Sequence, residues 1–315
     1  MLMPRESSVQ KNSDAGRSLP IFALLISATL WGSSWYPFRL LAENGFSGLW
    51  GVMSTQLIAA LVCLIYFGRQ LFMLRWTRHA LAIGLFGGIC NTSYVMGTIE
   101  GEVMRTTLLL YLSPLWTIFV ARWLLHEPLH RKGMGVVALS LSGAMLILWP
   151  WGVGVTGFGF GDLWGLVAGI SFAVYNVLIR RHLEISIPHK TFVVMFGTAL
   201  VAMAAMLLVD YRPMHKITGF NAAIIVGIAL MLVLNVTIQQ YGLERLSAIR
   251  ASVIMMSELV FATLFAWWWA HEVPGMRELS GGLFIVVAGL LSSVIVPGRT
   301  PLQHDNLSKW PRRSA

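Results

Sequence analysis

Apolar residues occur in ten long runs that short polar segments separate. The runs lie at about residues 20–41, 49–68, 79–99, 105–125, 133–151, 162–181, 189–209, 221–241, 249–270 and 279–297. Glycine, proline or charged residues mark the ends of each run. An α-helix needs roughly 20 apolar residues to cross the hydrocarbon core of a bilayer. The pattern therefore predicts an all-α integral membrane protein with ten transmembrane helices.

The composition excludes several other classes of protein. Of the 315 residues, 56% are hydrophobic and 12% are charged, and the mean hydropathy is +0.69. A soluble domain carries about 25% charged residues, so a soluble core, a disordered chain and a disulfide scaffold are excluded. The two cysteines, Cys63 and Cys90, lie inside apolar runs, where we expect them to act as small buried hydrophobes. Only one of the 14 acidic residues, Glu258, lies deep within a run.

The distribution of basic residues predicts an orientation in the membrane. The chain has 23 Lys and Arg residues and a formal net charge of +9. Cytoplasmic loops of membrane proteins are enriched in Lys and Arg. With both termini in the cytoplasm, seventeen basic residues fall in inner segments and five in outer segments. The sequence therefore predicts cytoplasmic termini, a lipid bilayer as the surroundings and no nucleic-acid partner.

The two halves of the chain resemble each other. The fourth and ninth runs align without a gap at an offset of 145 residues, which pairs Arg105 with Arg250 and Trp123 with Trp268. Chance similarity between apolar helices is the alternative interpretation. Five helices are an odd number, so a duplicated half enters the membrane from the opposite side, as in inverted-repeat transporters. The predicted organisation is a polar cytoplasmic tail at 1–19, a first repeat at 20–151, a Gly-rich outer linker at 152–161, an inverted second repeat at 162–297 and a basic cytoplasmic tail at 298–315.

Several segments together resemble the drug/metabolite transporter superfamily, and within it the EamA-type exporters with ten helices. They are the opening ATLWGSSWYPFR, the fourth run LLLYLSPLWTIFVARWLLHEP, an acid in the ninth run and a glutamate at the end of each repeat's fourth helix. The stretch YLSPLWTIF is also similar to exporters of aromatic and other amino acids (YddG-like). The resemblance implies export of small metabolites through a central cavity, in a bacterial inner membrane. Where the family often has Glu-Pro, this chain has Glu258-Leu259. The sequence alone therefore does not decide whether the helix is kinked at this position.

Polar and aromatic side chains inside the runs are candidates for lining a substrate path, because such groups are costly in hydrocarbon. Trp31 and Trp35 are four residues apart and share a helix face, where they suit stacking or cation–π contact with a substrate; an interfacial aromatic belt is the alternative. Pro37 and Pro114 are candidate hinges. The complete set of candidates for the path is Trp31, Trp35, Asn91, Tyr94, Tyr111, Trp116, Tyr175, Asn176, Gln239 and Glu258.

Glu258 is the most specific of these candidates. It lies nine residues into its run, or about 13 Å at 1.5 Å per residue, near the middle of the bilayer. A carboxyl group there suits a proton carrier or a ligand for a substrate amine, whereas a protonated glutamate bonded across a helix interface is the structural alternative. The amides of Asn91 and Gln239, with Asn235 and Gln240 nearby, suit a zwitterionic substrate or, equally, helix–helix hydrogen bonds.

Two motif matches do not indicate a cofactor or a metal. His126-Glu127-Pro128-Leu129-His130 fits the H-E-x-x-H pattern of zinc proteases, but its proline breaks the helix that the pattern needs. Gly152, Gly154 and Gly157 fit G-x-G-x-x-G, but no strand precedes them. The sequence therefore predicts no catalytic residue, no metal and no cofactor.

The predicted function is export of small metabolites, most of all amino acids of aromatic or broad range, by alternating access. The predicted partner is a small-molecule substrate. An intramembrane enzyme, a channel and a nucleotide-sugar carrier of the same superfamily are the alternatives.

Overall fold

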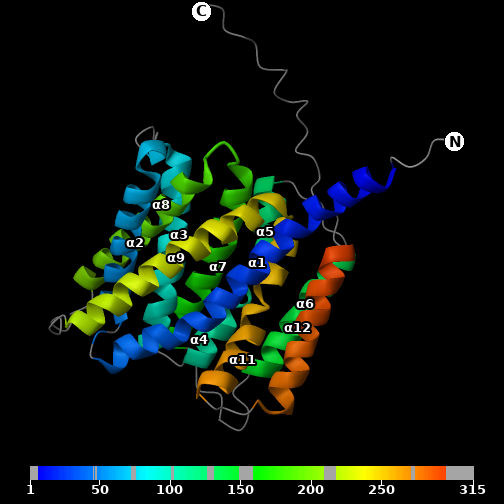
Figure 1. Cartoon of the computed structure of the whole chain (residues 1–315). Helices are drawn as coiled ribbons and strands as arrows, with labels where there is room; N and C mark the ends of the chain where they lie inside the picture. Colours follow the sequence, from blue (N-terminus) through cyan, green and yellow to red (C-terminus); the bar gives the residue numbers. More distant parts are fainter. Residues whose placement is uncertain are drawn as a thin grey trace, which may run out of the picture.

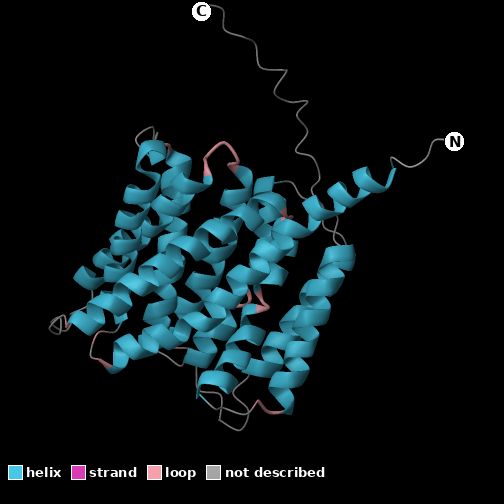
Figure 2. Ribbon diagram, in the orientation of Figure 1, coloured by secondary structure: helices cyan, strands magenta, loops and turns pink. Residues whose placement is uncertain are grey.

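The structure is a computed structural model that describes residues 6–44, 46, 48–71, 76–100, 103–125, 131–148, 159–208, 218–270 and 274–295. Every regular element in these ranges is an α-helix (Figure 2). The helices are α1 (Glu6–Glu43), α2 (Gly48–Leu71), α3 (Arg78–Glu100), α4 (Val103–Leu110), α5 (Ser113–Leu125), α6 (Arg131–Leu148), α7 (Phe160–Arg181), α8 (Ile187–Leu208), α9 (Gly219–Arg245), α10 (Ala248–Met255), α11 (Glu258–Ala270) and α12 (Met276–Ile295).

The helices have the length and apolarity of membrane spans. Among the described residues, nine candidate spans are found, and a shorter apolar helix at Leu279–Leu291 lies within α12. Two of the spans, Thr106–Leu125 and Ala248–Trp269, each contain a pair of helices, α4 with α5 and α10 with α11. The first helix begins at Glu6 and so extends into the segment predicted as a polar tail. The chain is therefore a multi-pass membrane protein.

Helices of the first half pack mainly against helices of the second half (Figure 1). The helix α3 packs against α7 and α8, α1 packs against α9 and α11, and α6 packs against α12. The contacts are similar when each helix is replaced by the helix at the same position in the other half. The contact of α3 with α7 then corresponds to that of α9 with α1, and the contact of α5 with α7 corresponds to that of α11 with α1. The main apolar core draws on helices from both halves. The fold therefore depends on contacts between the halves.

Figure 1 also shows how the chain enters and leaves the bundle. The described start of α1 and the described end of α12 lie at the same end of the bundle. The helix α4 lies toward the end at which α11 lies, whereas α5 lies toward the opposite end. The two broken spans therefore cross the bundle in opposite directions.

Close contacts between glycines bring helices of the two halves together. A Cβ atom added at Gly197 of α8 would lie 2.4 Å from the carbonyl oxygen of Gly84 in α3. Gly165 and Gly169, from a GxxxGxxxG pattern in α7, lie against the backbone of α4 in the same way. Small residues are typical of membrane helix interfaces because they let backbones approach closely. The GxxxGxxxG pattern therefore packs within the chain.

We expect Gly197→Ala to destabilise the protein. The added methyl group meets backbone atoms of α3, which can give way only if the helices separate, and overpacking of this kind costs about 1–3 kcal/mol. Thermal unfolding of the purified protein in detergent should show a lower midpoint for this variant. Gly227→Ala in α9 is the matched control, because a Cβ there has open space around it. Equal midpoints for the two variants would contradict the close approach of α3 and α8.

Basic side chains at one end of the bundle bind backbone carbonyl groups. Arg180 donates to the carbonyl oxygen of Leu246, and Arg181 donates to that of Leu124 at 3.1 Å. The Nζ of Lys190 donates to the carbonyl oxygen of Ile179 at 3.0 Å. Carbonyl groups near helix ends lack partners within their own helix, and cations there are also favoured by the helix dipole. These contacts tie the ends of α5, α7 and α9 together.

Candidate functional site

Two membrane-spanning segments are broken at corresponding positions. The first break is at Tyr111 and Leu112, between α4 and α5, and the second is at Met256 and Ser257, between α10 and α11. The two breaks are offset by 145 residues, which is the offset of the sequence similarity. Inside a membrane, interrupted backbone is tolerated where it is buried in protein or lines a cavity. The breaks therefore mark the place to look for a functional site.

Each break has a local cause. Pro114 occupies the first turn of α5, where a proline is well tolerated because the first backbone donors of a helix have no partner within it. The ninth span has no proline, yet it breaks at the equivalent place, where the Ser257 hydroxyl donates to the carbonyl oxygen of Ile254 at 2.7 Å. Competition of a serine side chain for backbone carbonyls loosens a helix. The ninth span is thus interrupted, which the sequence alone does not decide.

Glu258 follows the second break and lies near two tyrosines. The hydroxyl of Tyr111, at the first break, lies close enough to the Glu258 carboxyl group, at the second break, to interact with it. Tyr94 of α3 is close enough to Glu258 to interact electrostatically, and its hydroxyl lies 3.3 Å from the Thr107 hydroxyl of α4. Within the described ranges, Glu258 has no ion-pair partner. A partly buried acid with phenol neighbours and no basic partner can accept a cationic group or a proton.

A second polar group lies beside this cluster. Tyr175 of α7 faces the Gln240 amide of α9, but the geometry falls short of a hydrogen bond. Among the described residues, the two amide atoms of Gln240, which is fully buried, find no hydrogen-bond partner, and the same holds for Asn176, which is 1% exposed. Cys90 of α3 is close enough to both Glu258 and Tyr175 to interact with each of them electrostatically. Unpaired buried polar atoms are costly, which favours a place where water or a ligand satisfies them.

The two tryptophans of α1 have different neighbours. The indole nitrogen of Trp31 donates to the Asn235 side-chain oxygen at 3.1 Å once the amide is oriented so that donors face acceptors. Trp35 instead contacts Tyr36 edge to face at 5.7 Å, and Tyr36 in turn contacts Trp269 of α11. Trp31 is therefore linked to α9, whereas the contacts of Trp35 lead toward α11. Pro37 lies inside α1, which continues to Glu43.

The remaining candidates form local or separate contacts. The Asn91 amide donates to the carbonyl oxygen of Gly87 in its own helix at 3.0 Å. The Gln239 amide lies 3.9 Å from the Met255 sulfur in α10. Trp116 of α5 is half-buried, and its indole nitrogen has no partner. The structure thus brings Tyr94, Tyr111 and Glu258 together and places Tyr175 beside Gln240, but it does not join every candidate into one group.

Comparison with known proteins identifies the family. The EamA-like transporter family matches the chain twice, at residues 18–149 and 159–294. The chain belongs to this family. The first match covers α1 from residue 18 onward and α2–α6, and the second covers α7–α11 and α12 up to residue 294. The broken span is therefore present once in each EamA match.

The EamA chain is also similar to proteins named as transporters. It is 26% identical over 215 residues to an uncharacterized transporter of Archaeoglobus fulgidus, covering 68% of this chain and 76% of the relative. It is 23% identical over 290 residues to an uncharacterized transporter of Clostridium kluyveri, covering 85% of this chain and 91% of the relative. It is 22% identical over 211 residues to the pseudopaline exporter CntI of Pseudomonas aeruginosa, covering 66% and 72%. These names point to a transporter rather than an enzyme.

A solved crystal structure has the same fold. It matches with a TM-score of 0.74 at 18% sequence identity and covers 88% of this chain and 99% of that chain. At this identity the likeness concerns the fold alone. A YddG-like identity and an amino-acid substrate are not supported by the relatives' names.

Sequence reasoning underrated three residues of the EamA chain. The sequence singles out Gln239 for the path and gives Asn235 and Gln240 only as its neighbours. In the structure, Asn235 binds Trp31 and Gln240 faces Tyr175. Cys90 is buried, as expected, and it also interacts electrostatically with Glu258 and Tyr175. The available signal is spacing, because Asn235 and Gln239 are four residues apart and Cys90 directly precedes Asn91. The H-E-x-x-H match at 126–130 and the glycine motif at 152–157 lie outside the described residues.

Proposed function

We propose that this EamA protein exports small metabolites that carry an amine, amino acids among them, by alternating access. The observation that carries the proposal is Glu258 at the break between α10 and α11, close to the Tyr111 hydroxyl at the other break. A substrate amine satisfies the acid, and the unpaired amides of Asn176 and Gln240 suit its remaining polar groups. Tyr94, Tyr175 and Gln239 line the same region in this proposal, with Trp31, Trp35, Asn91 and Trp116 as outer parts of the path.

The proposed architecture is a pair of inverted five-helix repeats around this path. Four observations support it: the double family match, the equal offset of the two breaks, their opposite directions across the bundle, and the shared end of α1 and α12 (Figure 1). Inverted repeats permit one half to move against the other around a site near the middle of the membrane. Pro37 and Pro114 are the proposed hinges. The proposed location is a bacterial inner membrane with both termini in the cytoplasm.

Uptake into proteoliposomes tests the proposal. Purified protein is reconstituted, and flux of a panel of radiolabelled amino acids is measured with and without a proton gradient. We expect saturable flux above that of empty vesicles for at least one substrate. Flux no greater than that of empty vesicles across the panel would contradict amino-acid transport, and flux that does not saturate would indicate a channel.

Pseudopaline is a second candidate substrate. The observation that favours it is the similarity to the pseudopaline exporter CntI. Including labelled pseudopaline in the same panel separates the two candidates, because saturable flux of pseudopaline alone would replace amino acids as the proposed substrate while leaving the transport site unchanged.

A further inference from the structure

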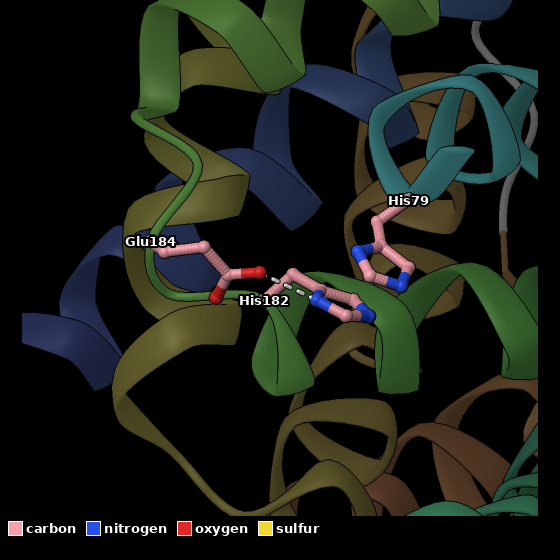
Figure 3. Close-up of side chains that lie close together, drawn as sticks. All are labelled: His79, His182 and Glu184. Carbon is pink, nitrogen blue, oxygen red and sulfur yellow. Dashed lines mark hydrogen bonds and ion pairs between the residues drawn. The ribbon is translucent and has the colours of Figure 1, made fainter. Parts of the chain in front are cut away.

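A cluster of metal-ligating side chains lies where α3 begins and α7 ends (Figure 3). It contains His79, the second residue of α3, His182, which directly follows α7, and Glu184 in the turn before α8. One ligand atom from each residue lies within 4.8 Å of the others. We propose that these three side chains bind Zn²⁺ or a similar divalent transition metal ion.

The chemistry of the cluster fits such an ion. Imidazole nitrogens and a carboxylate oxygen are among the usual ligands of Zn²⁺, and three protein ligands plus a water complete a tetrahedral site. The Nδ1 atom of His182 lies 2.6 Å from Oε1 of Glu184 (Figure 3). The two side chains are hydrogen-bonded to each other in the metal-free protein. An ion held by both would take the place of this hydrogen bond.

Closing the site needs a small rearrangement. Ligand atoms around a tetrahedral Zn²⁺ are about 3.4 Å apart, given bonds of roughly 2.1 Å. The rings of His79 and His182 are stacked, with centroids 4.1 Å apart and planes inclined by 17°. Nitrogen lone pairs lie in the ring plane, so stacked rings do not point at a common ion until His79 turns. His79 is partly exposed and Glu184 is exposed, so both side chains have room to move.

The surrounding charges set the expected strength of binding. Arg78 and Arg181 lie close enough to His79 to interact with it electrostatically, and their positive charges oppose a cation. The Glu184 carboxylate offsets part of that repulsion. The bound ion also keeps an open position for water. We therefore expect weaker binding than at a closed structural site with four protein ligands.

The ion would link the two EamA matches. His79 belongs to the first match, whereas His182 and Glu184 belong to the second. The helix α3 already packs against α7 and α8. A metal bound by all three residues therefore tethers the halves at this end and stabilises the folded state by mass action.

Calorimetric titration of the purified full chain with Zn²⁺ tests the site. We expect saturable binding of one ion, with affinity lowered at least about tenfold by His79→Gln or His182→Gln, since even outer-shell losses at metal sites cost 10–100-fold. Zn²⁺ should also raise the thermal unfolding midpoint of the wild type but not of His79→Gln. Because His79 is partly exposed, its replacement leaves the core intact.

Two controls keep the result specific to this cluster. His189→Gln removes a nearby histidine whose Nδ1 lies 2.6 Å from the Ser186 hydroxyl, outside the cluster, and should leave Zn²⁺ affinity unchanged. A variant with both His126 and His130 replaced by alanine should also keep the wild-type affinity. Equal affinity in wild type and His79→Gln, or no saturable binding by the wild type, would overturn the proposal.

Discussion

Replacing Glu258 with alanine should lower substrate affinity by about ten- to a hundredfold. A hydrogen bond to a charged group contributes about 1.5–3 kcal/mol, and every 1.4 kcal/mol is about a tenfold change in affinity. In this variant the proposed substrate amine loses Glu258, the one acid that the described part of the site offers it. The Tyr111 hydroxyl loses its acidic neighbour as well. The half-saturating substrate concentration for flux in proteoliposomes measures the effect.

Glu258→Gln separates the two roles of the acid. If the carboxyl group carries a proton, the glutamine variant should retain substrate exchange but lose the dependence of flux on pH. Glu43→Gln is the matched control, because Glu43 is an exposed acid at the end of α1 that pairs with Arg39 at 3.0 Å. Unchanged pH dependence in Glu258→Gln would exclude proton transfer through this residue, and wild-type affinity in Glu258→Ala would exclude it as a substrate ligand.

Replacing Lys190 with alanine should destabilise the protein by about 3–5 kcal/mol, the usual cost of leaving one partner of a buried ion pair alone. The Lys190 side chain is fully buried, and its Nζ lies 2.6 Å from Oε1 of Glu244. The variant leaves the largely buried Glu244 with only a long contact to Arg245, at 3.4 Å. It also frees the carbonyl oxygen of Ile179. Chemical unfolding in detergent measures the change.

Lys190→Met with Glu244→Gln tests the cause of that loss. The double variant removes both charges while keeping most of the volume, so it should recover much of the stability that Lys190→Ala loses. Arg245→Ala is the surface control, because its contact with Glu244 is partly exposed and exposed pairs contribute about 0–1 kcal/mol. Equal losses of unfolding free energy in Lys190→Ala and Arg245→Ala would show that burial of the Lys190–Glu244 pair does not add to stability.

The helices of the fold were predictable because their signal is local. Each of the ten apolar runs contains described helix, and Glu258 stood out because an acid inside hydrocarbon is costly wherever the chain folds. The break at Met256 and Ser257 was not predictable from proline, because no proline is present there. Its position emerges only from comparison with the break beside Pro114.

The partners of the site residues were not predictable, because they come from distant parts of the chain. Tyr111 and Glu258 come close only because the two broken spans pack together, with α5 against α10, and Trp31 meets Asn235 only because α1 packs against α9. Trp31 and Trp35 share a helix face, but the face alone does not say which helix each indole contacts. The cluster at His79 was missed for the same reason, since its histidines lie in different halves and neither belongs to a recognised motif.

The native cysteines allow a direct test of the proposed path. Cys90 interacts electrostatically with both Glu258 and Tyr175, whereas Cys63 is fully buried in the apolar core. Cys63→Ser therefore leaves a single thiol beside the path, and Cys90→Ser leaves a single thiol away from it. The rate at which a small methanethiosulfonate reagent labels each variant in proteoliposomes is the measurement. The account predicts that Cys90 is labelled, that a transported substrate slows its labelling, and that Cys63 stays unlabelled. A Cys90 that no small reagent reaches, or whose labelling a transported substrate leaves unchanged, would contradict a substrate path between the two halves.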